Sequence, residues 1–363
     1  MRSLPVELYT EILLYLDRSE LAAVSASTKT LQTLATPLLY RHIVFQKNSS
    51  IEQIVRLLTT LDNCTHAIAP LIQRLELDWT GRSDRAATIA SGLSIDLPRM
   101  AGLTYLAVSP ALDIFTWAFD DVTMPALLEF HLASWFKLDR GFLARHPRLK
   151  RLSLGKSNGG SPPFVDPMPQ GLEYLRMSSA TRALTLLERL PHGKDAKLAR
   201  FDLGVSSTRE SYPRRERLEI LRLIEDEFPT CLQVNIFGQH AKSLLDDPRA
   251  PSIDHVARVG VPCYHHGISH YTDADLRAIL VGVARVFPSV RTLDFLGGED
   301  GFANHPLSYQ DIARLVQTIH GLRCVELVVF PHGEAYSRSG TDGFEPLSRS
   351  RVDDYPRILW PEL

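Results

Sequence analysis

The chain has few cysteines, no long apolar run and almost no excess of charge. Among its 363 residues the only cysteines are Cys64, Cys231, Cys263 and Cys324, which form no Cys-x-x-Cys pair. Such spacing is typical of free thiols in a reducing compartment, so we expect a cytoplasmic or nuclear protein. The absence of an apolar run of about 18 residues, and of a basic start followed by an apolar stretch, predicts neither a membrane span nor a signal peptide. A formal net charge of −2 favours neither nucleic acid nor a membrane as a partner.

The sequence also lacks a recognisable phosphate-binding motif, since neither a P-loop nor Gly-x-Gly-x-x-Gly occurs. The glycine-rich stretch at 297–301 carries two acids, Glu299 and Asp300, where a phosphate would bind. The acidic pairs Asp246-Asp247 and Asp353-Asp354 are sequence neighbours, whose side chains point apart in an extended segment. We therefore predict a protein that is not an enzyme and needs no cofactor.

One cluster contains metal-ligating atoms: Cys263, His265, His266 and His270. These residues could supply thiolate and imidazole ligands to zinc, which leaves open an enzyme with a metal site. Their spacing matches no zinc finger, and no second ligand pair lies nearby in the sequence. We favour the simpler interpretation, a loop with solvated histidines, and predict no metal.

Apolar residues at helical spacing dominate the first forty residues, which predicts three short helices in a compact unit. Two apolar rows lie on the first of these helices: Leu8, Ile12 and Leu16, and beside them Val6, Tyr9 and Leu13. Two rows are more than one core needs. We therefore expect this helix to have one partner inside the chain and one outside it.

The same stretch carries a specific pattern. It reads Leu-Pro-x-Glu-Leu-x-x-Glu-Ile-Leu-x-x-Leu from residue 4, then Leu-Ala-x-Val-Ser from residue 21 and Leu-Leu-Tyr-Arg-His-Ile from residue 38. This pattern resembles the F-box, although Ser-Ala-Ser-Thr-Lys at 25–29 stands where many F-boxes have a Cys-Arg pair. The resemblance implies that residues 2–46 bind the Skp-type adaptor of a cullin–RING ubiquitin ligase. It assigns the adaptor contacts to Leu4, Pro5, Leu8, Ile12, Leu13, Leu16 and Leu21. The alternative is a plain helical cap on a larger domain.

From residue 50 onward the chain repeats the pattern apolar-x-x-apolar-x-apolar, which predicts a short buried strand each time. The pattern begins at Ile72, Leu103, Leu127, Leu149, Leu172, Leu198, Cys231, Val256, Val290 and Leu322. Between several of these strands we predict helices. Three begin with capping boxes at Ser50, Thr272 and Ser308, and a fourth spans 216–228. Strands that alternate with helices favour a parallel sheet.

These repeats resemble leucine-rich repeats. The asparagine of that family, eight residues after the first leucine, is missing, and Thr80, Ala111, Ser157, Ala180 and Ser206 stand in its place. We expect an α/β fold in which a small three-helix F-box precedes an irregular leucine-rich-repeat-like solenoid at 47–330. A tail or cap follows at 331–363, where we expect Trp360 and Leu363 to cover the last repeat. The alternative is an ordinary α/β domain whose buried strands imitate the pattern.

In each predicted strand the residues between the apolar positions point away from the core, toward the concave face of a solenoid. The first column comprises Arg74, Tyr105, Glu129, Arg151, Tyr174, Arg200, Gln233, Arg258, Thr292 and Cys324. The second comprises Glu76, Ala107, His131, Ser153, Arg176, Asp202, Asn235, Gly260, Asp294 and Glu326. Tyr and Arg most often anchor protein interfaces, so the candidate target contacts are Tyr105, Arg151, Tyr174, Arg176, Arg200 and Arg258. The alternative is an unspecialised strand surface.

Together these features predict a substrate receptor of a cullin–RING ubiquitin ligase. Its partners would be a Skp-type adaptor, a cullin reached through that adaptor, and an unknown protein target. The alternative function is a non-enzymatic leucine-rich-repeat scaffold unrelated to ubiquitin.

Overall fold

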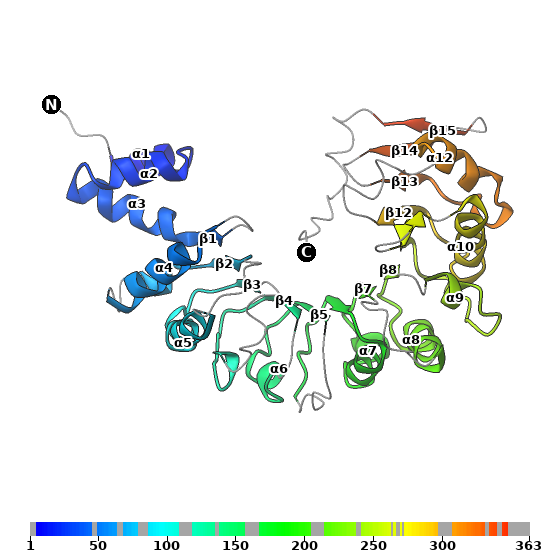
Figure 1. Ribbon diagram of the computed structural model, residues 1–363, viewed down its shortest axis with the longest axis horizontal. Coiled ribbons are helices and arrows are strands. Elements are labelled where there is room, and N and C mark those ends of the chain that lie inside the picture. Colours follow the sequence, from blue (N-terminus) through cyan, green and yellow to red (C-terminus); the bar gives the residue numbers. More distant parts are fainter. Residues whose placement is uncertain are drawn as a thin grey trace. The chain divides into compact units, whose positions relative to one another are not determined.

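The structure is a computed structural model that divides the chain into two compact units. The N-terminal unit comprises Met1–Leu152 and Ser157–Pro169, and the C-terminal unit comprises Ser153–Lys156 and Gln170–Leu363. Figure 1 labels their helices and strands. The structure describes residues 5–45, 49–63, 68–78, 86–108, 118–134, 138–156, 167–204, 214–236, 241–262, 264–265, 269–270, 272–296, 307–330, 334–339 and 343–347.

The N-terminal unit opens with three helices, α1 (Val6–Leu13), α2 (Arg18–Ser25) and α3 (Lys29–Arg41), as the sequence predicts. A capping box starts α2: the Glu20 amide donates to Asp17 Oδ1 at 2.9 Å, and the Asp17 amide donates to Glu20 Oε2 at 2.8 Å. The helices share a small core of Leu13, Leu21 and Ala35, with Leu16, Val24, Leu34, Leu38 and Leu39 partly buried against it.

A strand that was not predicted follows α3 directly. Strand β1 (His42–Phe45) pairs in parallel with β2 (Arg74–Leu77), with Ile43 opposite Leu75. The sheet therefore begins inside the segment predicted as a helical domain at 2–46. A sequence signal for this strand exists, because Tyr40-x-x-Ile43-x-Phe45 has the same apolar spacing as the later strands.

The rest of the N-terminal unit alternates strands with helices. Strands β2, β3 (Tyr105–Val108) and β4 (Glu129–Ser134) are parallel neighbours. The helical segments are α4 (Ile51–Asn63), η1 (Ala69–Leu71), α5 (Ala86–Asp96), η2 (Leu97–Arg99) and α6 (Phe142–Arg145). Helices α4 and α5 pack together on one side of the strands. The apolar strand residues Leu75, Leu106 and Phe130 are almost fully buried, and the Phe130 ring lies 4.6 Å from that of Phe142 on α6.

The C-terminal unit continues this alternation. Its parallel strands are β6 (Tyr174–Met177), β7 (Arg200–Leu203), β8 (Gln233–Ile236), β9 (Arg258–Pro262), β12 (Thr292–Leu296) and β13 (Leu327–Val329). Its helical segments are α7 (Ala180–Leu187), η4 (Gly193–Asp195), α8 (Arg214–Glu227), α9 (Ala241–Leu245), α10 (Asp273–Val286), α12 (Tyr309–Thr318) and η5 (His320–Leu322). Strand β5 (Arg151–Lys156) is divided between the units, and β10 (Tyr264–His265) and β11 (Ser269–His270) form a small hairpin.

Successive repeats share one hydrogen-bond arrangement. The carbonyl of Gln73 accepts the amides of Thr104 and Tyr105 at 2.9 and 3.1 Å, and the carbonyl of Ala257 accepts those of Arg291 and Thr292 at 2.8 and 3.0 Å. Both carbonyls belong to the residue after the first apolar position. The same pair of hydrogen bonds, two consecutive amides to one carbonyl, forms at the carbonyls of Thr104, Leu128, Glu173, Ala199, Leu232 and Arg291. The predicted repeats therefore have equivalent backbone geometry.

This arrangement corrects the register of the last repeat. The carbonyl of Arg291 accepts the amides of Glu326 and Leu327, and Thr292 lies opposite Leu327. The last repeat therefore starts at Val325 rather than Leu322, because Leu327 occupies the strand position that Thr292 occupies in the preceding repeat. Cys324 and Glu326 consequently do not belong to the two columns, whose last members are Leu327 and Val329.

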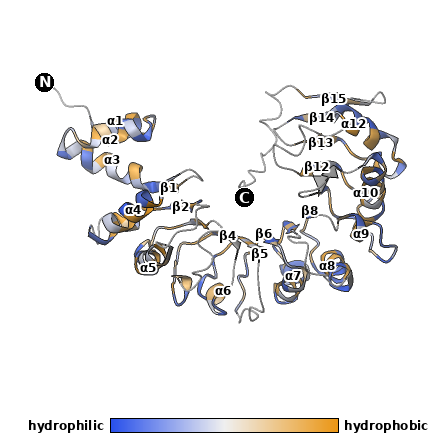
Figure 2. Ribbon diagram, in the orientation of Figure 1, coloured by the Kyte–Doolittle hydropathy of each residue, from blue (hydrophilic) through white to orange (hydrophobic). Residues whose placement is uncertain are grey.

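Two predicted helices of the C-terminal unit begin where the sequence indicates, whereas the helix predicted at 216–228 spans Arg214–Glu227. Thr272 and Ser308 accept the amides of Asp275 and Asp311, each at 3.1 Å, so both predicted capping boxes form. Figure 2 shows hydrophobic and hydrophilic residues together on α7 and α8, as expected of helices that cover a sheet. None of the helices in the described part of the chain is long and apolar enough to cross a bilayer.

The sheet of the C-terminal unit ends in two antiparallel strands. Strand β14 (Ala335–Ser339) pairs with β13, and β15 (Gly343–Pro346) pairs with β14. The Phe330 ring stacks on Phe295 and Tyr309, with centroids 5.2 and 4.6 Å away. Strands β14 and β15 therefore extend the sheet within the predicted tail at 331–363, whereas Trp360 and Leu363 lie outside the described residues.

Candidate protein-interaction surfaces

Helix α1 and the turn after it expose large apolar side chains. Leu8 is 47% exposed, and Tyr15, just beyond the helix, is 86% exposed. We refer to Val6, Leu8, Ile12, Leu14 and Tyr15 as the α1 apolar surface. Exposed apolar residues that cluster in this way mark sites of association with another molecule.

The structure sorts the predicted adaptor contacts into groups. Pro5, Leu8 and Ile12 are exposed on or next to α1. Leu13 and Leu21 are buried in the core of the three helices, and Leu16 is partly buried against that core. Leu13 differs from Ile12 because the 100° step between neighbouring helical residues turns it toward α2 and α3. Leu4 lies outside the described residues. Val6, Leu14 and Tyr15 are exposed residues that the predicted contacts omit.

On the strands of the N-terminal unit, planar side chains stack across neighbouring strands. The Arg74 guanidinium lies 3.7 Å from the centroid of the Tyr105 ring, and Arg74 also pairs with Glu76. The Tyr105 ring in turn lies 5.1 Å from the ring of His131. Burial, assisted by the negative charge of Glu76, raises the pKa of Tyr105 to about 12. Tyr105 is therefore a neutral phenol in a stack of planar groups.

A second set of charges on this face surrounds Glu129. Its carboxylate accepts a bond from Arg151 Nη1 at 3.1 Å and lies 3.7 Å from His131 Nε2. His131, and after it the positive charge of Arg151, lowers the pKa of Glu129 although partial burial opposes the shift. The Arg151 side chain is 53% exposed, so this pair is open to solvent.

The corresponding face of the C-terminal unit holds a buried network around Asp202. Arg200 donates to both Asp202 oxygens, at 2.9 and 2.8 Å, and Tyr174 Oη donates to Oδ2 at 2.8 Å. Asn235 Nδ2 donates to Oδ1 at 2.5 Å, and Gln233 Nε2 reaches Asn235 Oδ1 at 3.4 Å. The Asp202 side chain is 0% exposed. Burial raises the pKa of Tyr174, and the negative charge of Asp202 raises it further.

A second buried pair lies on β9 and β12. Arg258 donates to both oxygens of Asp294, at 2.5 and 2.9 Å. Burial raises the pKa of Asp294, and Arg258 opposes the shift. Gly260 lies between Asn235 and Asp294 in the strand register. A Cβ at residue 260 would lie 2.7 Å from Leu296 Cδ1 and would also collide with Asn235, so a larger residue there would have to displace these two side chains.

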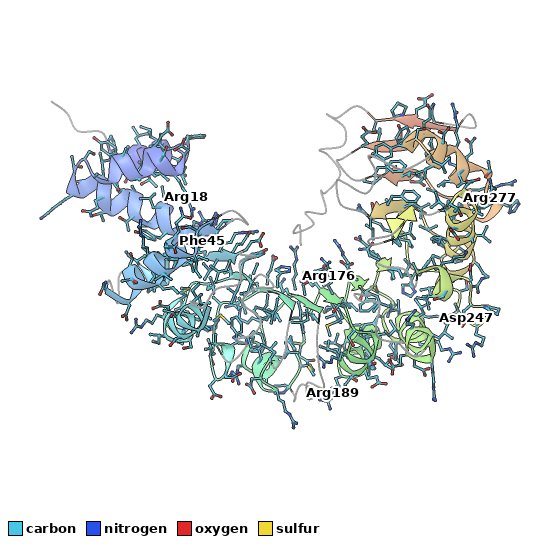
Figure 3. All side chains as sticks on the ribbon, viewed as in Figure 1. Arg18, Phe45, Arg176, Arg189, Asp247 and Arg277 are labelled. Carbon is cyan, nitrogen blue, oxygen red and sulfur yellow. The ribbon has the colours of Figure 1, made fainter. Side chains whose placement is uncertain are left out.

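The predicted target contacts are divided between the two units. Tyr105 and Arg151 belong to the N-terminal unit, where Arg151 is the more exposed. Tyr174, Arg200 and Arg258 belong to the C-terminal unit and bind its buried carboxylates. Figure 3 shows Arg176 on the strand side of the C-terminal unit, with Arg189, Asp247 and Arg277 on the helical side.

The candidate metal ligands are only partly described. His265 and His270 lie on the paired strands β10 and β11, whereas Cys263 and His266 lie outside the described residues. No group of three or more potential ligands gathers within the described segments. Cys231 and Cys324 are free thiols, and burial raises the pKa of Cys231 to about 12.

A short motif with the spacing of a hydrolase nucleophile begins at the end of β5. Residues 155–159 read Gly-Lys-Ser-Asn-Gly, which has the Gly-x-Ser-x-Gly spacing of a nucleophile elbow. Gly155 and Lys156 end β5, whereas the serine lies outside the described residues. The motif by its spacing alone is a weak signal, because an elbow also needs a helix directly after the serine and a histidine partner. The absence of enzymatic activity therefore stays a prediction.

Comparison with known protein families gives a match in the first helices. The F-box-like family matches residues 1–46, which include α1, α2, α3 and β1. No curated protein matches the chain. The family match falls on the same helices that carry the α1 apolar surface.

Proposed function

We propose that this protein is a substrate-recognition subunit of a cullin–RING ubiquitin ligase. It binds a Skp-type adaptor through the α1 apolar surface and a protein target through its strand faces. The observation that carries the proposal is the coincidence of the F-box-like match at residues 1–46 with exposed apolar residues on α1. F-box domains bind Skp-type adaptors, and the adaptor in turn would connect the chain to a cullin.

Physical chemistry supports an external partner for α1. Burying a Leu or Ile side chain contributes roughly 1.5–3 kcal/mol, yet Leu8 and Ile12 stay about half exposed. The core of the three helices is already supplied by Leu13, Leu21 and Ala35. Binding to an adaptor with a complementary groove would bury these side chains and so add the hydrophobic free energy that folding of the chain does not provide.

We further propose that the repeats form a leucine-rich-repeat-like solenoid. The recurring double hydrogen bond and the sequential parallel strands within each unit support this arrangement. Such a surface would present the two columns of strand residues to a target. The chain itself would do no chemistry and would raise the local concentration of target and ubiquitin-charged enzyme, in the cytoplasm or the nucleus.

The first test is Leu8→Asp in the intact chain, assayed by pull-down with a purified Skp-type adaptor. Because a carboxylate in the apolar contact would be desolvated without a partner, we expect adaptor binding to be lost. Val281→Asp is the matched control, since Val281 is 52% exposed but lies on α10. Circular dichroism should show that both variants remain folded.

Two results would redirect the proposal. Wild-type binding by Leu8→Asp would remove the α1 apolar surface from the interface. No binding by the wild-type chain would favour a leucine-rich-repeat-like scaffold unrelated to ubiquitin. Point variants are preferable to deletion of residues 1–46, because that deletion also removes β1 from the sheet.

A further inference from the structure

A group of basic side chains lies where the helices of the N-terminal unit meet its sheet. His42 on β1 is directly opposite Arg74 on β2. Arg41 precedes His42, and its Nε donates to Gln73 Oε1 at 2.8 Å. Arg18 begins α2, in the part of the unit that also holds Phe45 (Figure 3). We refer to Arg18, Arg41, His42 and Arg74 as the basic corner.

The carboxylates near the basic corner have other partners. Glu76 pairs with Arg74, and Asp17 and Glu20 bond to each other's backbone in the capping box of α2. Across the described segments, no carboxylate lies within ion-pair distance of Arg18 or Arg41, and both side chains are exposed. These two guanidinium groups therefore keep donors available for an anionic partner.

Electrostatics supports treating these residues as one surface. Partial desolvation lowers the pKa of His42 most, and the positive charges of Arg41, Arg74 and Arg18 lower it further, in that order. The three arginine side chains are therefore all close enough to His42 for their charges to affect it. The chain as a whole carries a formal net charge of −2, so this gathering of basic side chains is a local feature and not part of an overall positive charge.

We propose that the basic corner binds an acidic segment of a partner protein. Arg74 is the first residue of the first column and stacks on Tyr105 of that column, and His42 lies opposite Arg74 on the neighbouring strand β1. The basic corner is thus continuous with the strand face and lies at the end of the first column that is next to the three N-terminal helices. If the proposed function holds, the acidic segment belongs to the target, because the target is the partner that meets the strand face.

The test measures binding of a fluorescein-labelled glutamate decamer to the intact chain by anisotropy at low ionic strength. We expect Arg18→Gln with Arg41→Gln to weaken binding by about tenfold, because an exposed ion pair contributes up to about fivefold. Higher salt should weaken wild-type binding. Arg277→Gln, which removes an exposed arginine on α10, is the control for loss of surface charge elsewhere and should bind as wild type does. Arg18→Lys with Arg41→Lys should restore most of the affinity.

Several outcomes would overturn the proposal. One is that the wild-type chain does not bind the glutamate decamer, and another is that the double Gln variant binds it as tightly as the wild type does. The proposal would also fail if the wild-type chain bound a glutamine decamer equally well or a single-stranded oligonucleotide more tightly. An adaptor pull-down with the same variants separates this proposal from the proposed function. If the double Gln variant lost binding of both the adaptor and the peptide, the basic corner would belong to the adaptor interface. The proposal that it binds the target would then be refuted. Peptide binding by a chain that binds no adaptor would retain the acidic partner and refute the ligase role.

Discussion

The strand faces of the two units carry similar residues, but their ion pairs differ in burial. In the N-terminal unit the Arg151 and Glu129 side chains are 53% and 28% exposed. In the C-terminal unit the Arg200 and Asp202 side chains are 19% and 0% exposed, and Asn235 and Tyr174 also bond to Asp202. An exposed pair contributes little to stability but remains available to a partner, whereas a buried pair is costly to break. The comparison teaches that arginine on a strand face is no sign of a binding site until its partners are known.

The largest expected effect comes from breaking the buried network. Asp202→Ala removes the acceptor of Arg200, Tyr174 and Asn235, and we expect it to lower the free energy of unfolding by roughly 3–5 kcal/mol. The matched change in the N-terminal unit, Glu129→Ala, should cost less than about 1 kcal/mol. Urea unfolding followed by circular dichroism measures both. Equal losses in the two variants would refute the contrast between the faces.

An intermediate effect should follow from filling the space at Gly260. The Cβ of Gly260→Ala would press on Leu296 and on the Asn235 side chain that holds Asp202. We expect a loss of roughly 1–3 kcal/mol, as for other overpacked sites. Gly171→Ala is the control in the same unit, because a Cβ there meets nothing within 4 Å. A loss of stability at Gly171 as large as at Gly260 would show that packing around Asn235 is not the cause.

The smallest effect tests whether exposure, rather than the unit, sets the strength of a charge pair. Lys242 donates to Asp275 at 2.6 Å in the C-terminal unit, with side chains 41% and 32% exposed. The bond from Lys242, followed by that from Thr272, lowers the pKa of Asp275 to about 2. The stabilisation is therefore present above the unfolded pKa and is lost as the pH falls toward 2. Thermal midpoints of the wild type and Asp275→Asn should differ slightly near neutral pH and converge in acid. A difference that persists or grows in acid would contradict this origin.

Local patterns predicted the elements well because they depend on neighbours in the sequence. The boxes at Thr272 and Ser308 cap α10 and α12, since the oxygen and the amide that it caps are three residues apart. The apolar spacing found nine of the ten predicted strands in register. It failed at the last one because Leu322 and Val325 are both buried, and only pairing with Thr292 shows which of them starts the repeat.

The candidate surfaces were less predictable. The leucine pattern of α1 indicated an external partner, but it could not separate exposed Ile12 from buried Leu13, which depends on where α2 and α3 pack. Arg200 and Arg258 looked available on the strand face. Asp202 lies two residues after Arg200 on the same strand, and the strand register places Asp294 next to Arg258, so both guanidinium groups are occupied.

The sequence by itself determined the three N-terminal helices, the alternation of strands with helices and the apolar surplus on α1. These follow from spacing along the chain, where each residue's role depends on neighbours a few positions away. Only the tertiary structure decided that β1 joins the sheet, that the last repeat starts at Val325 and that the two strand faces differ in their charges. The two strand pairings join residues more than 30 positions apart, and the burial of each ion pair, including the local pair Arg200–Asp202, is set by everything packed around it.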